Sequence, residues 1–211
     1  MTDPMHTHLE FVVDMSGSMS SMSFEAQQGY QALLEVQEKI EGKCSVSLNR
    51  FSSGYENVYR DRAVADAPGL QVNSRGDSAL YDAISRAATD LGATLNSRPE
   101  VERPGKIVMI VLSDGVDTAS LQHDLADVHR LVTRQQSIYK WFFIYLGSRH
   151  DAIKVGTGLG IPEGHCLLFK PERVKQALTA TSDLIAQLRS ADAAQRWGGI
   201  QFTPQQRQRV I

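Results

Sequence analysis

The stretch LEFVVDMSGS, residues 9–18, decides how we expect this chain to fold. Its first half, residues 9–13, is a largely apolar run that predicts a buried β-strand. Asp14, Ser16 and Ser18 follow at once, so a carboxylate and two hydroxyls share a tight turn that contains glycine. In open α/β sheets, ligands bind beyond the carboxyl ends of the strands. The stretch therefore predicts an α/β fold with a polar site at the end of its first strand.

Apolar runs and helical patterns alternate along the rest of the chain, which is typical of a parallel α/β sheet. Residues 52–54 are too few for a parallel crossover, so the strands on either side of them should form an antiparallel hairpin at a sheet edge. We expect six strands, at residues 9–13, 44–51, 55–59, 106–112, 139–146 and 165–169. We expect helices between Ser23 and Gly42 and at residues 79–95, 121–133, 151–160 and 172–190, the third of them capped by Ser120.

The length of 211 residues fits one α/β domain with a sizeable core. We expect residues 1–190 to form this domain and residues 191–211 to form a polar, basic tail. Within that tail, Thr203 and Pro204 are a suitable cap and first residue for one more short helix.

Charge and cysteine content exclude several classes of protein. The chain has 22 Lys and Arg against 24 Asp and Glu, a net charge of −2, which argues against binding nucleic acid over the whole surface. The two cysteines, Cys44 and Cys166, cannot form a four-ligand zinc site. They fall on strands in opposite halves of the expected sheet, so we interpret them as buried apolar residues and not as a disulfide.

The N-terminus has no basic segment followed by an apolar run, so we expect no secretory signal. The longest apolar stretches, residues 107–112 and 141–146, are far shorter than the ~18–20 residues that a membrane span requires. These features favour a cytoplasmic protein without a membrane partner.

Other oxygen-bearing side chains are expected near the first turn. Asp114 directly follows another buried strand, in LSDG at residues 112–115, and Asp77 and Ser78 precede the helix expected at 79–95. Carboxylates and hydroxyls are hard oxygen donors, which Mg²⁺ and Mn²⁺ select. No His or Cys lies in these segments, which argues against Zn²⁺ or Cu²⁺.

Together, Asp14-x-Ser16-x-Ser18, SALYD at residues 78–82 and LSDG at 112–115 resemble the metal-ion-dependent adhesion site of von Willebrand factor A domains. The resemblance covers residues 8–190 and is nearest to short stand-alone bacterial and phage members, including those linked to tellurium resistance. It implies a doubly wound, Rossmann-like, mostly parallel sheet with one antiparallel edge strand. It also implies that Mg²⁺ or Mn²⁺ is held by Asp14, Ser16, Ser18, Ser78 and Asp114, some of them through water.

The family usually has Thr where this chain has Ser78, and often Gly where it has Asp77. Serine keeps the hydroxyl, whereas Asp77 adds a carboxylate. We leave two interpretations of Asp77 open: an additional metal ligand, or the N-cap of the following helix.

The function implied by the resemblance is binding and not turnover. One coordination position of the metal would stay open, and an Asp or Glu of a protein partner would complete it. We therefore expect a protein-binding module, not an enzyme, in a bacterial or phage cytoplasm.

Three alternatives compete with this interpretation. A Mg²⁺-dependent phosphatase with an aspartate nucleophile would need a second carboxylate two residues after Asp14, where this chain has Ser16. Some domains of the family bind RNA, but residues 170–211, with seven Lys and Arg against three Asp and Glu, are only a modest basic patch. Finally, Asp14, Ser16 and Ser18 alone would suit a turn that merely caps a helix.

Two further groups of residues lie close to the predicted site in the sequence. Met15, Met19 and Met22 suit either an adaptable partner-binding rim or simple packing under the loop. His6 and His8 alternate onto one side of the N-terminal segment, and we interpret them as a mobile or edge-strand pair, not as metal ligands.

Overall fold

The computed structural model describes residues 1–191 and 199–211. Its centre is a six-stranded sheet with the strand order β3-β2-β1-β4-β5-β6, parallel except for the antiparallel pair of β2 and β3. The predicted α/β sheet with one antiparallel edge strand is thereby confirmed. The strands are β1 (Asp3–Asp14), β2 (Lys43–Phe51), β3 (Tyr55–Ala63), β4 (Pro104–Ser113), β5 (Phe142–Gly147) and β6 (Cys166–Leu168).

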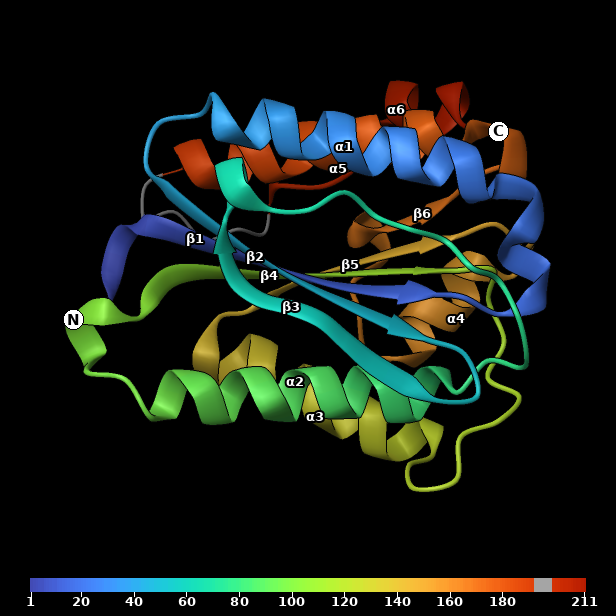
Figure 1. The fold of residues 1–211 in the computed structure, drawn as a ribbon, viewed down its shortest axis with the longest axis horizontal. Helices are drawn as coiled ribbons and strands as arrows, with labels where there is room; N and C mark the ends of the chain where they lie inside the picture. Colours follow the sequence, from blue (N-terminus) through green and yellow to red (C-terminus); the bar gives the residue numbers. More distant parts are fainter. Residues whose placement is uncertain (192–198) are drawn as a thin grey trace.

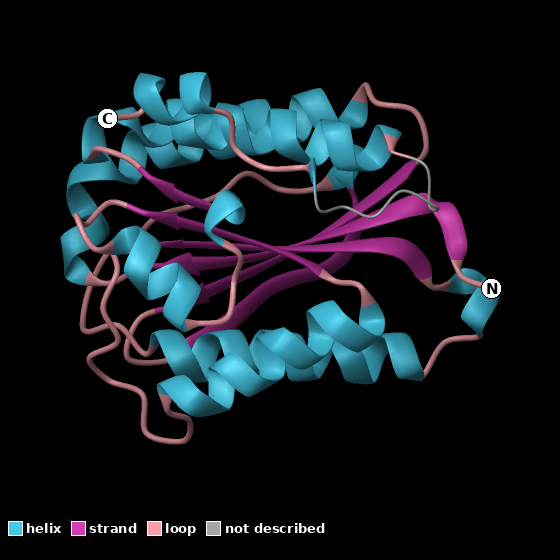
Figure 2. Cartoon of the chain, turned by 180° about the vertical axis from the view of Figure 1, so that it is seen from behind, coloured by secondary structure: helices cyan, strands magenta, loops and turns pink. Residues whose placement is uncertain are grey.

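Helices cover both faces of the sheet (Figure 1; Figure 2). One face carries α1 (Ser23–Glu38), α5 (Val174–Ser190) and α6 (Pro204–Arg209). The other carries α2 (Leu80–Asn96), α3 (Leu125–Tyr139) and α4 (Ala152–Gly158). Short 3₁₀ turns are η1 (Gly17–Met22), η2 (Val64–Asp66), η3 (Glu100–Glu102), η4 (Glu163–His165) and η5 (Pro171–Arg173). No helix in the described ranges is both long and apolar enough to cross a membrane.

The sheet divides the interior into two apolar cores, because successive side chains of a strand point to opposite faces. Leu9 and Phe11 of β1 pack under α1 and α5, whereas Val12 packs under α2 and α3. β4 is buried throughout residues 107–112, as a central strand covered on both faces should be.

Helices α1 and α5 pack closely against each other. A Cβ atom added at Gly29 of α1 would lie 2.8 Å from Leu178 Cδ1 and 3.0 Å from Lys175 Cα, so only glycine allows this approach. The guanidinium of Arg189 donates to the backbone carbonyls of residues 37, 40, 41 and 42. These bonds satisfy acceptors that the end of α1 would otherwise leave free.

Two predicted boundaries are wrong for local reasons. The third helix starts at Leu125 and not at residue 121, because Asp124 and Asp127 form a capping box and Leu121 is 94% exposed. The same helix continues to Tyr139, predicted as strand, and ends because Lys140 adopts a left-handed conformation with φ of 58°.

The N-terminal strand is longer than predicted. β1 begins at Asp3 and lies between β2 and β4, so His6 and His8 are 1% and 2% exposed in the middle of the sheet. The interpretation of this pair as a mobile or edge-strand pair is therefore wrong.

The cysteines behave as predicted, since Cys44 and Cys166 are buried free thiols on β2 and β6. The capping box of Thr203 confirms the predicted short helix, α6, and Phe202 and Val210 on either side of it join the core under α1 and α5. The part of the predicted tail at residues 192–198 lies outside the described residues.

Candidate metal centre

The predicted site residues of the first turn lie where the strand order reverses. The chain adds β2 on one side of β1 and later adds β4 on the other side. Because β1 and β4 are parallel neighbours, the loops that follow them meet at the carboxyl edge of the sheet. Val13 pairs with Leu112, so the next residues, Asp14 and Ser113, end their strands side by side.

The carboxylate of Asp14 is the centre of a group of hydroxyls. Its Oδ2 accepts hydrogen bonds from Ser78 Oγ at 2.9 Å and from Ser113 Oγ at 2.8 Å. Its Oδ1 accepts from the backbone N–H of Ser16 at 2.7 Å, and Ser16 Oγ lies 3.2 Å from Ser18 Oγ. Four hydroxyls from three separate segments of the chain, those of Ser16, Ser18, Ser78 and Ser113, therefore gather at one buried carboxylate. We call this group the Asp14 cluster.

Within residues 1–191 and 199–211, no cationic side chain is a hydrogen-bond partner of the central carboxylate of the Asp14 cluster. Asp14 itself is 0% exposed. Burial raises the pKa of Asp14, and the hydrogen bonds from its serine partners offset only part of that effect. A buried carboxylate is costly unless a cation or a set of donors compensates it. The cluster is thus an electronegative position at the edge of the sheet.

Asp114 lies next to this cluster. It follows Ser113 directly, is partly buried, and forms no hydrogen bond or ion pair with another described side chain. Burial raises the pKa of Tyr145, and the negative charges of Asp14 and then Asp114 raise it further, so both carboxylates act on the same phenol. The structure therefore brings a second carboxylate to the same strand ends.

Backbone hydrogen bonds hold the first loop in place. Met15 donates its N–H to Phe51 O at 2.6 Å, and Gly17 donates to Gly76 O at 3.0 Å. The N–H of Arg75 donates back to Met15 O at 2.7 Å. The three methionines of this region are 1–5% exposed and belong to the core under α1, so of their two interpretations packing holds and the partner-binding rim is wrong.

The start of α2 is capped by the loop that follows β4. The N–H of Tyr81 donates to Asp117 Oδ1 at 3.1 Å, and that of Asp82 donates to Ser120 Oγ at 3.0 Å. The N-cap residue Ala79 has no side chain that could do so. These bonds satisfy donors that the first turn of a helix leaves free. Ser120 therefore caps α2 and not the helix for which it was predicted.

The same loop, residues 117–123, also fixes Ser78. The N–H of Ser78 donates to Thr118 Oγ1 at 3.0 Å, and the N–H of Thr118 donates to Ser78 O at 2.8 Å. In return, the Asp82 carboxylate accepts from the backbone N–H groups of residues 121–123 at 2.8–3.1 Å. The loop and the start of α2 thus stabilise each other, and together they fix the position of the Ser78 hydroxyl.

Asp77 stands apart from these bonds. Its side chain is exposed, and its backbone N–H donates to Ser53 Oγ at 3.1 Å. The capping interpretation of Asp77 is wrong, because α2 starts three residues later and Asp117 and Ser120 satisfy its free donors. Its role as an additional ligand stays a prediction.

Sequence reasoning missed Ser113, Asp117 and Ser120 as parts of this region. Ser113 carries a usable signal, since it is the polar last residue of an otherwise apolar strand next to Asp14 in register. Asp117 and Ser120 carry none, because their partners lie in a helix about 37 residues earlier in the chain.

The donor set of the Asp14 cluster fits a hard divalent cation. The cluster offers the carboxylate of Asp14 and serine hydroxyls, and the neighbouring Asp114 adds a second carboxylate, so all the ligands are oxygen atoms. Nowhere in the described ranges do three His, Cys, Asp or Glu side chains form a group that could hold a metal. Any metal at this edge therefore has to rely on hydroxyls and water in addition to carboxylates.

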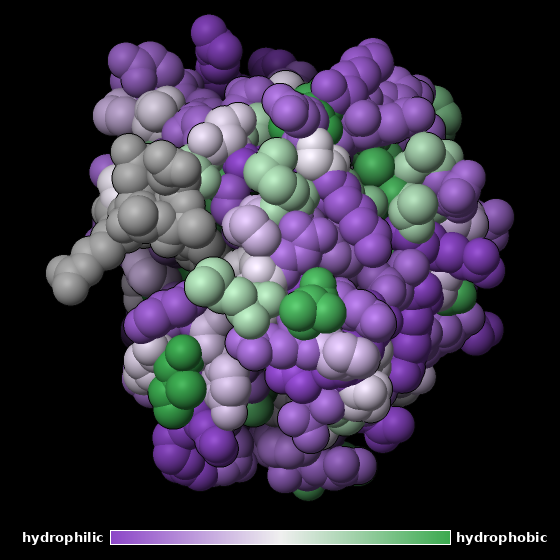
Figure 3. All heavy atoms as spheres, turned by 90° about the vertical axis from the view of Figure 1, so that its left-hand side faces the viewer, coloured by the Kyte–Doolittle hydropathy of each residue, from purple (hydrophilic) through white to green (hydrophobic). Residues whose placement is uncertain are grey.

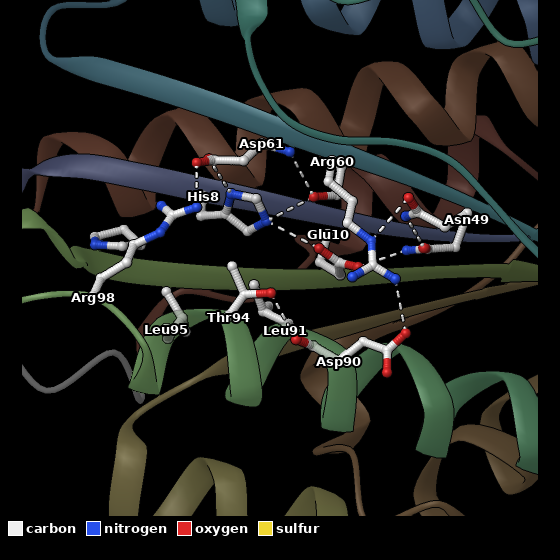
Figure 4. A pocket seen from close by; sticks show the side chains of 13 residues that line it. His8, Glu10, Asn49, Arg60, Asp61, Asp90, Leu91, Thr94, Leu95 and Arg98 are labelled. Carbon is white, nitrogen blue, oxygen red and sulfur yellow. Dashed lines mark hydrogen bonds and ion pairs between the residues drawn. The ribbon is translucent and has the colours of Figure 1, made fainter.

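A second buried polar group, the His8 cluster, lies between the sheet and α2 (Figure 4). His8 Nε2 is 2.9 Å from Glu10 Oε2, and His8 Nδ1 is 3.5 Å from Asp61 Oδ1, while Arg98 pairs with the other oxygen of Asp61 at 2.7 Å. The cavity beside them measures about 20 Å³, room for one water molecule. This cluster is too closed to admit a substrate, so we assign it a structural role.

Neither a protein-family model nor a curated protein sequence matches the chain. Solved structures do match it. Proximal thread matrix protein 1 from the mussel byssus, with a zinc-occupied adhesion motif, is 13% identical over 86% of this chain and 46% of that chain, with a TM-score of 0.60. This chain therefore spans less than half the length of that protein.

Two further structures show the same arrangement. The ArnB paralog VWA2 from Sulfolobus acidocaldarius is 19% identical, covering 82% of this chain and 44% of that one, with a TM-score of 0.54. The von Willebrand factor domain of the type V pili tip protein Mfa5 from Porphyromonas gingivalis is 8% identical, covering 88% and 97%, with a TM-score of 0.59. With its central β1, its antiparallel edge strand and helices on both faces, this chain has the von Willebrand factor A fold.

Proposed function

We propose that this chain is a divalent-metal-dependent protein-binding module, with Asp14, Ser16, Ser18, Ser78 and Asp114 as its metal site. One observation carries the proposal: a fully buried carboxylate, Asp14, is surrounded by hydroxyls and has no cationic partner among the described residues. A buried carboxylate needs hydrogen-bond donors, a cation or a metal to compensate it, and the donors around Asp14 offset only part of the effect of its burial. A bound divalent ion would supply that missing positive charge and would leave a coordination position for an outside ligand.

Mg²⁺ or Mn²⁺ suits this site best. Its donors are all oxygen atoms, and hard cations of this size select oxygen ligands. The zinc in the adhesion motif of the mussel protein supports a divalent metal in this fold. Asp14 and Asp114 together would balance the charge of the ion, and the exposed Ser18 and Asp77 border the site on the surface.

The ligand we propose is an Asp or Glu side chain of a protein partner. A carboxylate is the hard oxygen donor that protein surfaces offer most readily, and it would complete the coordination shell beside Asp114. The pilus and byssus proteins of the same fold support an interaction role. We further propose, from the resemblance to short stand-alone members, that the module works in a bacterial or phage cytoplasm.

We propose binding and not catalysis. An aspartate nucleophile must meet its substrate directly, whereas the Asp14 side chain, 0% exposed beneath its serine partners, would act on an outside ligand only through a bound ion. The position two residues on, where an aspartate-nucleophile phosphatase has its acid, is Ser16. These two facts support the module over the phosphatase alternative.

Thermal unfolding with Mg²⁺ or with EDTA tests the metal site. A ligand at a hundred times its dissociation constant stabilises the native state by about 2.7 kcal/mol. We expect Mg²⁺ to raise the melting temperature of the wild type and of the control Asp66→Ala, an exposed aspartate on η2, but not of Asp14→Ala. Equal melting temperatures of the wild type in Mg²⁺ and EDTA would overturn the proposal.

Two further assays separate the functions. A partner captured in Mg²⁺, lost in EDTA and lost in Asp14→Ala would support the binding module. Phosphatase activity that disappears in Asp14→Asn would favour the enzyme instead. Binding to RNA that is steep in salt and insensitive to EDTA would favour the nucleic-acid alternative.

A further inference from the structure

A second surface site lies at the opposite end of the sheet from the Asp14 cluster. There the C-terminal halves of α2 and α3 border a groove of about 790 Å³, within the range of ~300–1,000 Å³ typical of small-molecule sites. Ile107 and Trp141, at the start of β4 and just before β5, belong to its lining and are 7% and 5% exposed. Figure 3 shows this end of the molecule, where hydrophobic side chains lie among hydrophilic ones.

A comparison of two glycines inside helices, Gly29 of α1 and Gly92 of α2, shows how the groove differs from the closely packed contact of α1 with α5. Gly29 is required by contact, because a Cβ atom there would meet α5. Gly92 of α2 lines the groove, and a Cβ atom there would meet no described residue within 4 Å. Glycine inside a helix costs about 0.5–1 kcal/mol relative to alanine. Packing against the described residues does not explain Gly92, whereas the close approach of an outside molecule to bare helix backbone does.

The charged residues that line the groove in the described part of the chain all have one sign. Arg103, Arg134 and Lys140 line it, and its lining contains no Asp or Glu among the described residues. Arg103 donates to the carbonyls of Asn96 and Arg98, and Lys140 donates to a carbonyl of its own helix end. These partners are neutral, and within residues 1–191 and 199–211 none of the three cations forms an ion pair.

We propose that this groove binds a single-chain anionic amphiphile, that is, an acyl chain ending in a carboxylate or phosphate. The apolar chain would lie against Gly92, Ile107 and Trp141, and the head would meet Arg134 with Arg103 or Lys140. A flat bilayer surface cannot reach the two apolar side chains, because both are more than nine-tenths buried in the recess. The occupant is therefore one molecule that enters the groove.

This site is independent of the proposed metal site. Ile107 and Asp114 are seven residues apart along β4, which corresponds to roughly 23 Å at ~3.3 Å per residue. A variant that abolishes the response to Mg²⁺ should therefore leave the groove intact, and the two proposals can fail separately.

Calorimetric titration with decanoate and decyl phosphate tests the proposal in the full chain. We expect both to bind the wild type, with the amide of Gly92 and the indole of Trp141 shifting in two-dimensional NMR spectra. Gly92→Leu, which fills the groove, and Arg134→Glu should each weaken decanoate binding at least tenfold. Lys39→Glu, which reverses an exposed cation at the end of α1 on the other face, should bind as the wild type does.

Gly92→Ala provides a variant that should stay folded, because a Cβ atom there has room among the described residues. It should raise the melting temperature while weakening decanoate binding, a combination that a purely structural glycine would not show. Wild-type affinity in Gly92→Leu, or equal affinity for decyltrimethylammonium, overturns the proposal. The proposal is also overturned if decanoate does not bind, or if the protein binds anionic phospholipid vesicles or an acidic peptide more tightly than decanoate. A dimer in sedimentation experiments, with a second copy of the chain in the groove, would overturn it as well.

Discussion

At the scale of single residues, Asp61 shows how one unusual backbone conformation serves a buried group. It has φ of 47° at an irregular point in the pairing of β2 and β3. Such a bulge re-aims a side chain, and here it turns Asp61 from the edge strand toward His8. Burial alone lowers the pKa of His8, but hydrogen bonds to Asp61 and Glu10 outweigh it and raise that pKa. The pKa of Asp61 is lowered in turn by His8 and Arg98, against the effect of its own burial.

These shifts predict a window of pH in which the His8 cluster stabilises the fold. The raised His8 pKa contributes stability that is fully present below about pH 6.5 and lost as the pH rises through the folded value. The lowered Asp61 pKa contributes stability that is present above about pH 3.8 and lost as the pH falls. The pair therefore stabilises most between these limits.

Asp61→Asn tests this window, because asparagine tolerates the same backbone conformation. We expect it to lower the free energy of unfolding by about 1.5–3 kcal/mol at pH 6, the range for a hydrogen bond to a charged group. The loss should be smaller at pH 9 than at pH 6, because the raised pKa of His8 makes its contribution fall as the pH rises, whereas the ion pair of Asp61 with Arg98 remains to be lost at both values. Urea unfolding at both pH values measures it, with Asp66→Asn as the exposed control. An equal loss at both values would contradict the prediction.

At the scale of elements, the start of α2 and the 117–123 loop form one unit. The helix has no cap of its own, and the loop has no regular structure, yet each satisfies the free donors of the other. Because Ser78 is bonded into the same unit, its hydroxyl reaches Asp14 only while the loop is in place. Asp82 is the residue on which the loop depends most.

Asp82→Ala should therefore unfold more easily and respond less to metal. It leaves the backbone N–H groups of residues 121–123 without their acceptor, which we expect to cost about 1–3 kcal/mol. Amide hydrogen exchange should accelerate in residues 118–123, and the Mg²⁺-dependent rise in melting temperature should shrink. Asp90→Ala is the matched control on the same helix. It removes partly exposed ion pairs worth about 0–1 kcal/mol, so a loss as large as that of Asp82→Ala would contradict the assignment.

At the scale of the whole molecule, the two faces of the sheet are packed to different degrees. The face under α1 and α5 is closed by Gly29, by Arg189 and by α6 with its flanking apolar residues. The face under α2 and α3 leaves a groove along the C-terminal halves of its helices. Replacing a helix glycine by alanine should therefore lower the stability on the first face and raise it on the second.

Gly29→Ala and Gly92→Ala make this comparison. Gly29→Ala forces a methyl group against Leu178 and the backbone of α5, which should cost about 1–3 kcal/mol. Gly92→Ala adds a methyl group in open space and restricts the unfolded chain, which should add about 0.4–1 kcal/mol. Calorimetric melting of both variants measures the difference, and a loss of stability in Gly92→Ala would show that α2 is packed more closely than described.

Features that depend on neighbouring residues could be predicted from the sequence. Three features each express a local rule and have the expected form in the structure. They are the alternation of apolar runs and helical patterns, the three-residue gap at 52–54, and Thr203 with Pro204 as the cap and first residue of a short helix. Asp14 could be singled out for the same reason, since a carboxylate directly after a buried strand can only lie at the carboxyl edge of the sheet.

Features that depend on distant residues could not be predicted from the sequence. Whether His8 lies on an edge or in the centre depends on which strands pair with β1, and where α3 starts depends on Asp82 holding residues 121–123 outside the helix. Likewise Ser113, Asp117 and the buried methionines owe their roles to partners in other elements. Local patterns restrict the conformation of a few neighbours, whereas burial and hydrogen bonding across the sheet are decided by the packed structure as a whole, because only there do distant segments exclude water from one another.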